Sequence, residues 1–253
     1  MCDKKDSSAQ QEYQYSDYII AYIDILGVKE RLKNDDGTLI KSISNAINIA
    51  KESESIKKLS FDIKIFSDNF CIAKKIDDGK GVNVSDQLFW TCLFVTKIQE
   101  EIFCKEKLLL RGGITIGKLF IDDLFVIGDG LVKAYELESK IANMPRIIVD
   151  KTSYQIVSHS VHYDKTITCY KMLISDSDKK DDDISQQEYR FLNYLNGGDS
   201  ELKQSMEETL KSKMEIAEKL LSECIDKEAR KKIEWVLTTI KRQQNPPLSN
   251  KYI

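Results

Sequence analysis

The chain is poor in the residues that mark common zinc and hydrolase sites. Its 253 residues include only two histidines, His159 and His162, and none of its six cysteines belongs to a CxxC pair. A zinc site or a serine–histidine–aspartate hydrolase therefore has little support. Several of the cysteines fall within apolar segments, which indicates reduced thiols and a cytoplasmic protein.

The chain also lacks an excess of positive charge and any long apolar run. It carries 38 Lys and Arg against 41 Asp and Glu, a net charge of -3, which argues against general nucleic-acid binding. A small charged nucleotide is still an acceptable ligand, because the local field matters more than the total charge. No run approaches the length of a membrane span, the first fourteen residues have no apolar core of signal-peptide type, and no GxxxxGK[ST] motif occurs. We therefore expect neither nucleic acid nor membrane as a partner.

Apolar periodicity predicts an α+β domain followed by helices. Strands are expected near 18–24, 61–68, 70–73, 108–119, 124–127 and 145–150, and helices near 28–33, 39–50, 84–103 and 128–142. The order β-α-α-β-β-α-β-β-α-β describes helices packed on one mostly antiparallel sheet. A further strand is expected at 167–174. We predict a flexible head at 1–16, a main domain at 17–175 and a helical C-terminal extension at 184–245, with Gly197 and Gly198 between its helices.

Two of the predicted strands run apolar residues up to an aspartate and then stop. Asp24 ends the segment from Ile19, and Asp68 ends the segment from Phe61. A carboxylate at the end of a buried strand is costly unless a cation or several hydrogen bonds hold it, so the pair indicates a two-metal phosphate site. Taken singly, Asp24 is equally explained as a helix N-cap and Asp68 as a turn residue.

These two strands are followed by the glycine-rich strand Arg111–Gly117 and by the run Gly128–Glu138. With both aspartates in that order, residues 18–150 resemble the catalytic domain of class III nucleotide cyclases. The closest resemblance is to the Pycsar pyrimidine cyclases of bacterial anti-phage defence. It implies a ferredoxin-like βααββαβ core, and it does not extend to the C-terminal helices.

The resemblance implies a metal-dependent cyclisation. Attack of the ribose 3′-hydroxyl on the α-phosphorus of a nucleoside triphosphate releases pyrophosphate, and two divalent ions stabilise the charge that develops. Asp24 and Asp68 are the expected catalytic metal ligands, with the backbone carbonyl of Ile25 as a third. Oxygen ligands of this kind suit Mn²⁺ or Mg²⁺.

The expected substrate-binding residues are Lys64, Phe66, Arg111, Phe125 and Tyr135. Lys64 shares a strand face with Phe66 and with Asp68, from which it is separated by about 13 Å at strand rise. In the family a lysine at this position reads the base from the opposite subunit, which implies a homodimer with sites at the interface. The alternative for Lys64 is an exposed strand lysine. Arg111 is expected to clamp phosphate or to form a salt bridge with an acid.

The chain departs from the purine cyclases at three positions. Their asparagine and arginine, which orient ribose and steady the transition state, correspond here to Val132 and Glu136, and their purine-selecting acid corresponds to Phe125. Either Tyr135 or Lys133 is a candidate replacement for the arginine, although helix packing explains Tyr135 equally well. A standard adenylate or guanylate cyclase is therefore disfavoured.

Three functions follow as hypotheses. The first is a phosphorus–oxygen lyase that makes 3′,5′-cyclic UMP from UTP, or cyclic CMP from CTP, as a second messenger sensed by a separate effector protein. UTP is slightly favoured. The second is a catalytically silent cyclase-like module that binds nucleotide or protein. The third is a purine cyclase with substituted contacts.

Overall fold

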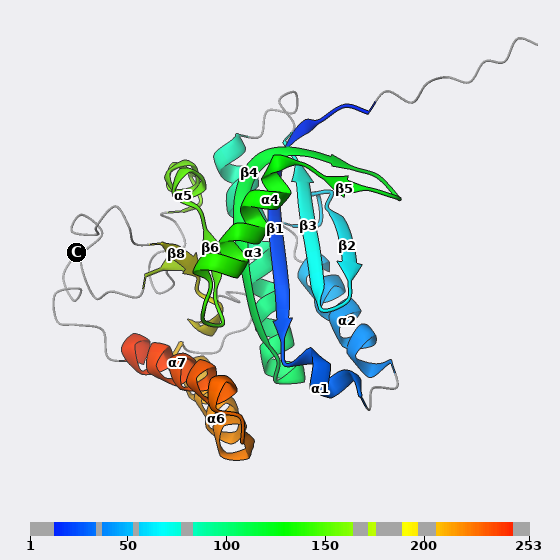
Figure 1. Cartoon of the computed structure of the whole chain (residues 1–253). Helices are drawn as coiled ribbons and strands as arrows, with labels where there is room; N and C mark the ends of the chain where they lie inside the picture. Colours follow the sequence, from blue (N-terminus) through cyan, green and yellow to red (C-terminus); the bar gives the residue numbers. More distant parts are fainter. Residues whose placement is uncertain are drawn as a thin grey trace, which may run out of the picture.

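The structure is a computed structural model that describes residues 13–33, 37–52, 56–76, 83–163, 172–175, 189–196 and 206–244. Its centre is one sheet whose strand order is β2-β3-β1-β4-β6-β8-β7, with β5 paired to β4 (Figure 1). All neighbouring strands are antiparallel except β4 and β6. The strands are β1 (Ser16–Leu26), β2 (Asp62–Phe66), β3 (Asn69–Lys75), β4 (Leu109–Ile121), β5 (Val126–Ile127), β6 (Ile147–Val149), β7 (Leu173–Ile174) and β8 (Arg190–Leu192).

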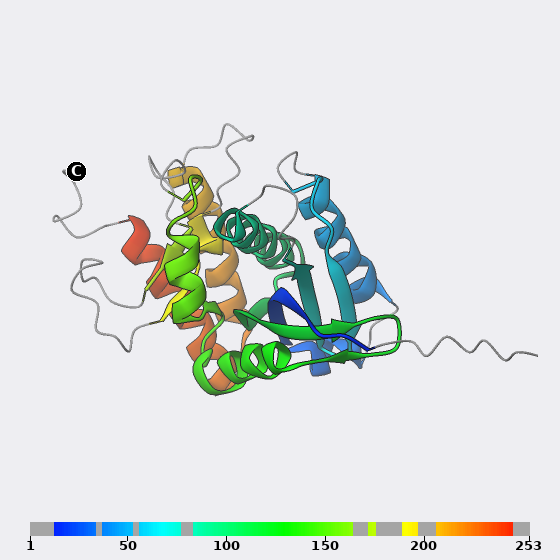
Figure 2. The same ribbon diagram turned by 90° about the horizontal axis from the view of Figure 1, so that it is seen from above.

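Helices cover both faces of this sheet. Helices α2 (Thr38–Glu52) and α3 (Val84–Glu101) lie on one face, and α4 (Asp129–Glu136) lies on the other (Figure 2). Two π-helical turns extend them, η1 (Ile102–Glu106) after α3 and η2 (Leu137–Ile141) after α4. The remaining helices are α1 (Val28–Leu32), α5 (Lys151–Val157), the 3-10 turn η4 (Tyr194–Asn196), α6 (Met206–Glu223) and α7 (Lys227–Gln244). The predicted α+β class and element order up to β6 are confirmed.

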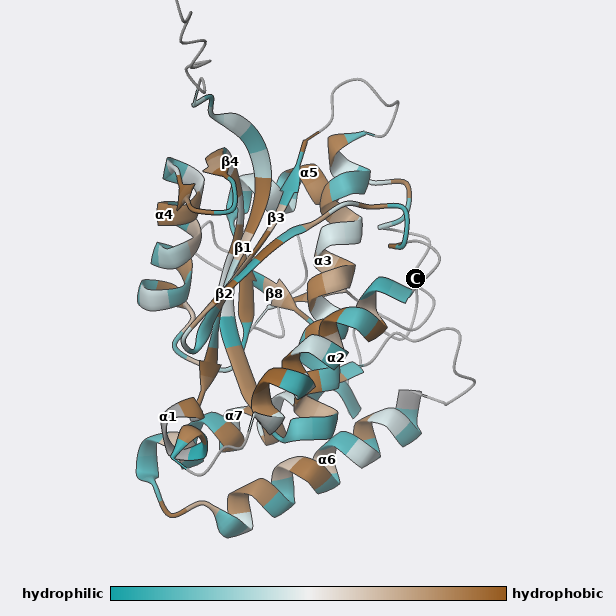
Figure 3. Cartoon of the chain, turned by 90° about the vertical axis from the view of Figure 1, so that its right-hand side faces the viewer, coloured by the Kyte–Doolittle hydropathy of each residue, from teal (hydrophilic) through white to brown (hydrophobic). Residues whose placement is uncertain are grey.

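Strand β1 is buried on both faces, as expected of a central strand. Ile19, Ala21 and Ile23 pack with α2 and α3, whereas Ile20 belongs to the cluster under α4. The middle strands are largely brown in Figure 3, while α6 carries hydrophilic and hydrophobic residues side by side. Helix α2 buries one apolar stripe, and Ile40 is 70% exposed because it lies outside this stripe, which consists of Leu39, Ile43, Ala46, Ile47 and Ala50.

The predicted helical extension is wrong at its beginning. Residues 190–192 form strand β8, which pairs with β6 and β7 and so belongs to the main sheet. Arg190, Phe191 and Leu192 are all buried, and their strand conformation comes from pairing with β6 and β7. The rest of the extension is the hairpin α6–α7, whose inner residues pack on η1 and η4. The strand expected from residue 167 is described only at 173–174, and the glycine pair at 197–198 lies outside the described residues. The division into domains stays a prediction.

The close approach of α4 to the sheet depends on Gly113. A Cβ atom at this position would lie 2.4 Å from the Leu137 Cβ and 2.5 Å from the Ala134 carbonyl oxygen. The absence of a side chain at Gly113 thus allows close approach of a neighbour, and that neighbour is the continuous segment of α4 and η2.

We expect Gly113→Ala to lower the free energy of unfolding by about 1–3 kcal/mol, because α4 must move to relieve the overlap. The measurement is chemical denaturation followed by circular dichroism. Gly27→Ala is the control, since nothing lies within 4 Å of its added Cβ and only its φ of 81° opposes a side chain. Wild-type stability of Gly113→Ala would contradict the packing described here.

Candidate active site

Asp24 lies near the C-terminal end of β1, on the face of the sheet that α4 covers. The strand continues through Ile25 and Leu26 before Gly27 turns the chain, so the expectation that it stops at Asp24 is wrong by two residues. Gly27, not Asp24, is the N-cap of α1, and no side chain caps this helix. The alternative of a capping role for Asp24 is thereby excluded, and its carboxylate is only 13% exposed.

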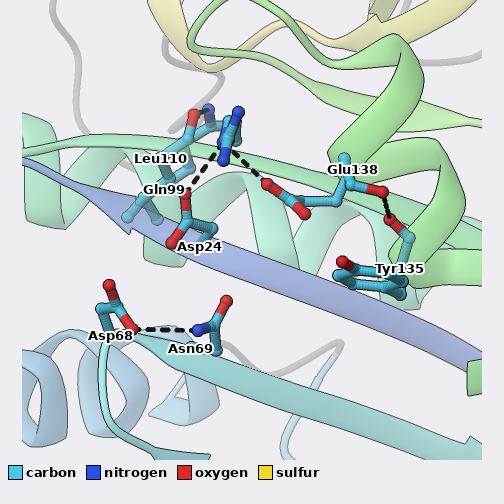
Figure 4. Close-up of polar contacts among 9 residues, drawn as sticks. Asp24, Asp68, Asn69, Gln99, Leu110, Tyr135 and Glu138 are labelled. Carbon is cyan, nitrogen blue, oxygen red and sulfur yellow. Dashed lines mark hydrogen bonds and ion pairs between the residues drawn. The ribbon is translucent and has the colours of Figure 1, made fainter.

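Asp68 lies in the tight turn that joins β2 to β3, and the turn is tied to the end of β1. The Ile25 N–H donates to the Asp68 carbonyl at 2.8 Å, and Asp24 lies opposite Asn69 in the β1–β3 register. The Asn69 amide donates to the Asp68 carboxylate at 3.0 Å (Figure 4). Two aspartates 44 positions apart in the sequence, Asp24 and Asp68, are thus carried by adjoining backbone segments.

Arg111 lies directly opposite Asp24 in the β1–β4 register. Its Nε atom is 2.8 Å from the Asp24 Oδ2 and 2.7 Å from the Glu138 Oε1. The single Nε–H donates to Asp24. The salt bridge that we predicted as one role of Arg111 is present, and its first partner is the proposed metal ligand itself.

Glu138 is the site residue whose role the sequence did not reveal. It lies on η2, 4% exposed, and its Oε1 has no hydrogen-bond donor among the described residues. Burial raises the pKa of this carboxyl, Arg111 opposes that shift, and the negative charges of Asp24 and Asp68 reinforce it. Glu138 ends the run that carries the family resemblance, but only the packing of η2 on β4 shows that it reaches Arg111.

Aromatic side chains border the carboxylates. The ring of Tyr22 lies 5.6 Å from that of Tyr135, edge to face, and 6.1 Å from that of Phe66. Burial, followed by the charges of Glu138 and Asp24, raises the pKa of Tyr22 to about 12, so its phenol stays protonated at neutral pH. Tyr22 was not among the predicted site residues, although its position two residues before Asp24 places it on the same strand face.

The other predicted substrate residues lie toward the β4–β5 hairpin. The Lys64 Nζ is 3.8 Å from a carboxylate oxygen of Asp123, which belongs to that hairpin, as does Phe125. Phe125 is exposed, and its backbone N–H donates to Asp122 at 2.6 Å. Of the predicted residues, Asp24, Asp68, Phe66 and Tyr135 therefore lie near Tyr22, and Arg111 joins them through Asp24. Lys64, on β2, reaches toward the β4–β5 hairpin, which carries Phe125.

The donor set suits a hard divalent cation. Carboxylate and carbonyl oxygens are what Mg²⁺ and Mn²⁺ prefer. Asp24 and Glu138 share the Arg111 guanidinium, and the negative charge of Asp68 acts on Glu138, so the local charge is negative. The buried Glu138 oxygen without a donor adds to this excess. Within the described segments, however, no group of three or more His, Cys, Asp or Glu side chains is arranged to hold a metal ion. In this conformation Asp24 Oδ2 is engaged by Arg111.

The structure also describes four of the cysteines, the surroundings of His162 and the length of the helices. Cys71, Cys92, Cys104 and Cys224 are free thiols, while Cys2 and Cys169 lie outside the described residues. His162 packs against Phe89 and Trp90. None of the described helices is long and apolar enough to cross a membrane.

Comparison with known proteins gives structural likenesses only. No family model matches the chain, and no curated protein matches it. The adenylyl cyclase CyaB from P. aeruginosa is similar with a TM-score of 0.47 and 16% identity, over 72% of this chain and 96% of that one. The guanylate cyclase domain of RhGC from Catenaria anguillulae, in complex with GTP, is similar with a TM-score of 0.47 and 13% identity, over 71% of this chain and 97% of that one. The monomeric guanylyl cyclase domain of RhoGC from Blastocladiella emersonii is similar with a TM-score of 0.46 and 13% identity, over 70% of this chain and 95% of that one. With TM-scores below 0.5, the activity of this chain has to be inferred from its own residues.

Proposed function

We propose that the protein is a metal-dependent pyrimidine nucleotide cyclase, which converts UTP, or alternatively CTP, to the 3′,5′-cyclic monophosphate and pyrophosphate. The observation that carries this proposal is the meeting of Asp24, Asp68 and Arg111 at one end of the sheet, where carboxylates for a cation adjoin a guanidinium for phosphate. The sequence order of these groups supports the same conclusion, since it resembles that of the class III cyclases.

Each group has a role in this reaction. Asp24 and Asp68, with the Ile25 carbonyl, would hold divalent cations, Mn²⁺ or Mg²⁺, which supply charge neutralisation at the reacting phosphate and acidify the ribose hydroxyl. Arg111 presents a planar fork of donors to phosphate oxygens. The exposed rings of Phe66 and Tyr135 offer apolar surface beside these charges. Lys64 is proposed to read the base.

The surface of α4 supports a substrate other than a purine nucleotide. Val132 is exposed and Glu136 pairs with Lys140 at 2.7 Å, so neither replaces the asparagine and arginine of the purine enzymes. Lys133 is held by Asp129 at 2.9 Å, one turn away on the exposed side of the helix. Of the two candidate replacements, Tyr135 is the one that contacts the site, through Tyr22.

Exposed apolar side chains around the site support a homodimer. They come from β2, from the β4–β5 hairpin and from α4, and they comprise Phe66, Leu124, Phe125, Ile127, Val132 and Tyr135. Several exposed apolar side chains on neighbouring elements are typical of an interaction site. We propose that a second copy of the chain covers it and brings its Lys64 to the nucleotide. A role in Pycsar antiviral defence, with a separate effector protein that senses the product, rests on the sequence resemblance.

A silent cyclase-like module is the second candidate, and the engagement of Asp24 by Arg111 favours it. The two are separated by incubating the purified protein with each of the four ribonucleoside triphosphates, with Mn²⁺ and then with Mg²⁺, and identifying products by mass spectrometry. We expect cyclic UMP or cyclic CMP. Cyclic AMP or cyclic GMP would instead indicate a purine cyclase, and no cyclic product from folded, dimeric protein would indicate the silent module.

A further inference from the structure

Glu138 is a buried carboxylate that shares its partner, Arg111, with Asp24. Its Oε1 lies 2.7 Å from the Arg111 Nε, but the only hydrogen on that nitrogen points to Asp24. The described residues supply no other donor to this oxygen. Because an ionised carboxylate without a donor is costly to bury, the arrangement is stable only while Arg111 stays close to Glu138.

The position of Glu138 is fixed by the packing of α4 and η2. Leu137, its neighbour, contacts the sheet so closely that Gly113 has no room for a Cβ atom, and the Ala134 carbonyl lies equally near. Glu138 therefore cannot follow a movement of Arg111 away from it without displacing the helix. Asp24, in contrast, has 13% of its side chain exposed, and its carboxylate shares the site with that of Asp68.

The guanidinium and a divalent cation compete for the same oxygen. Arg111 engages Asp24 Oδ2 at 2.8 Å, and a cation bound through this oxygen repels the guanidinium and competes with its hydrogen bond. Once displaced, Arg111 needs another negative partner within reach, and Glu138 is already at 2.7 Å. Its Nε–H can then donate to the oxygen that now lacks a donor.

We propose that Glu138 is a positioning residue: it holds Arg111 when Asp24 binds a divalent cation, and so makes cation binding and the placement of the guanidinium compatible. The inference rests on the proposed function only for the identity of the cation as a cofactor. It predicts that Glu138 affects cation affinity through Arg111, without being a cation ligand itself.

The test is a double-mutant cycle on Mn²⁺ binding, measured without nucleotide from the electron paramagnetic resonance signal of free Mn²⁺. Glu138→Gln is expected to weaken binding roughly tenfold, since displaced Arg111 then meets only a neutral amide. In an Arg111→Gln background, the same substitution is expected to change the affinity by about twofold or less. Glu136→Gln, on the same helical segment and paired with exposed Lys140, is the matched control and should leave the affinity unchanged.

Each other outcome overturns the proposal. An equal loss in both backgrounds would show that Glu138 acts on the cation independently of Arg111, as a ligand or through its charge, and no loss in the wild-type background would remove its role. Absence of Mn²⁺ binding to the wild-type protein, or binding that Asp24→Asn leaves intact, would show that Asp24 is not the site. Circular dichroism confirms that each variant is folded. Because the cycle needs no turnover, a failed cyclase assay with an intact cycle would reject only the proposed activity.

Discussion

Replacement of Asp68 by alanine is expected to reduce the rate of cyclic nucleotide formation by at least about a hundredfold. The change removes one of the two aspartates that we propose as cation ligands, and charge stabilisation worth several kcal/mol in the transition state corresponds to factors of this size. The folding cost is small, because Asp68 lies in a turn and its side chain, among the described residues, has one polar contact, with the neighbouring Asn69. The rate is measured as product from UTP and CTP by mass spectrometry.

Asp62→Ala is the matched control for this prediction. Asp62 is an exposed carboxylate on β2, the strand that leads into the same turn, but it lies at the opposite end of the strand. We expect it to retain the wild-type rate. If Asp68→Ala formed product as fast as Asp62→Ala, the assignment of Asp68 as a metal ligand would be wrong, whatever the protein makes.

The sequence allowed the core sheet to be predicted because its signals are local. The apolar run of β1, the glycine strand β4 and the helical spacing in α2 and α3 each depend on residues close in the chain. Strand β8 escaped prediction because it has only three residues, and its strand conformation comes from pairing with β6. The short helix α5 was missed as well, although Asp150 caps it through the N–H groups of Thr152 and Ser153.

Only part of the candidate site could be predicted from the sequence. The nearness of Asp24 and Asp68 follows from two apolar segments that each lead up to an aspartate and from a hairpin that returns beside β1. The contact of Arg111 with Glu138 does not follow from any strand pattern, because it depends on where η2 packs along β4. The close packing of η2 on β4 needs a position without a side chain at Gly113, and the sequence alone does not show which element packs there.

The C-terminal hairpin α6–α7 is expected to depend on one buried ion pair. Lys213 on α6 is 2% exposed; its Nζ lies 2.5 Å from a Glu100 carboxylate oxygen on α3 and donates to the Tyr194 carbonyl at 2.6 Å. Lys213→Met keeps the aliphatic stem but leaves both acceptors without this donor. We expect a loss of about 3 kcal/mol in the free energy of unfolding, the usual cost of breaking a buried pair on one side. Over a chain of this size that lowers Tm by roughly 6–12 °C.

The double variant Glu100→Gln with Lys213→Met tells whether the loss comes from the stranded charge. Removing both charges of a buried pair is often close to neutral, so the double variant should recover most of the stability in chemical denaturation. Lys211→Met, on the exposed side of the same helix, should change little. Equal losses for the single and double variants would assign the effect to packing alone.

The hairpin α6–α7 also bears on the site. Leu109 packs against its apolar cluster, and the facing pair Leu26 and Leu109 lies two residues along the strands from Asp24 and Arg111. A Lys213→Met protein that is still folded is therefore expected to bind Mn²⁺ more weakly than Lys211→Met.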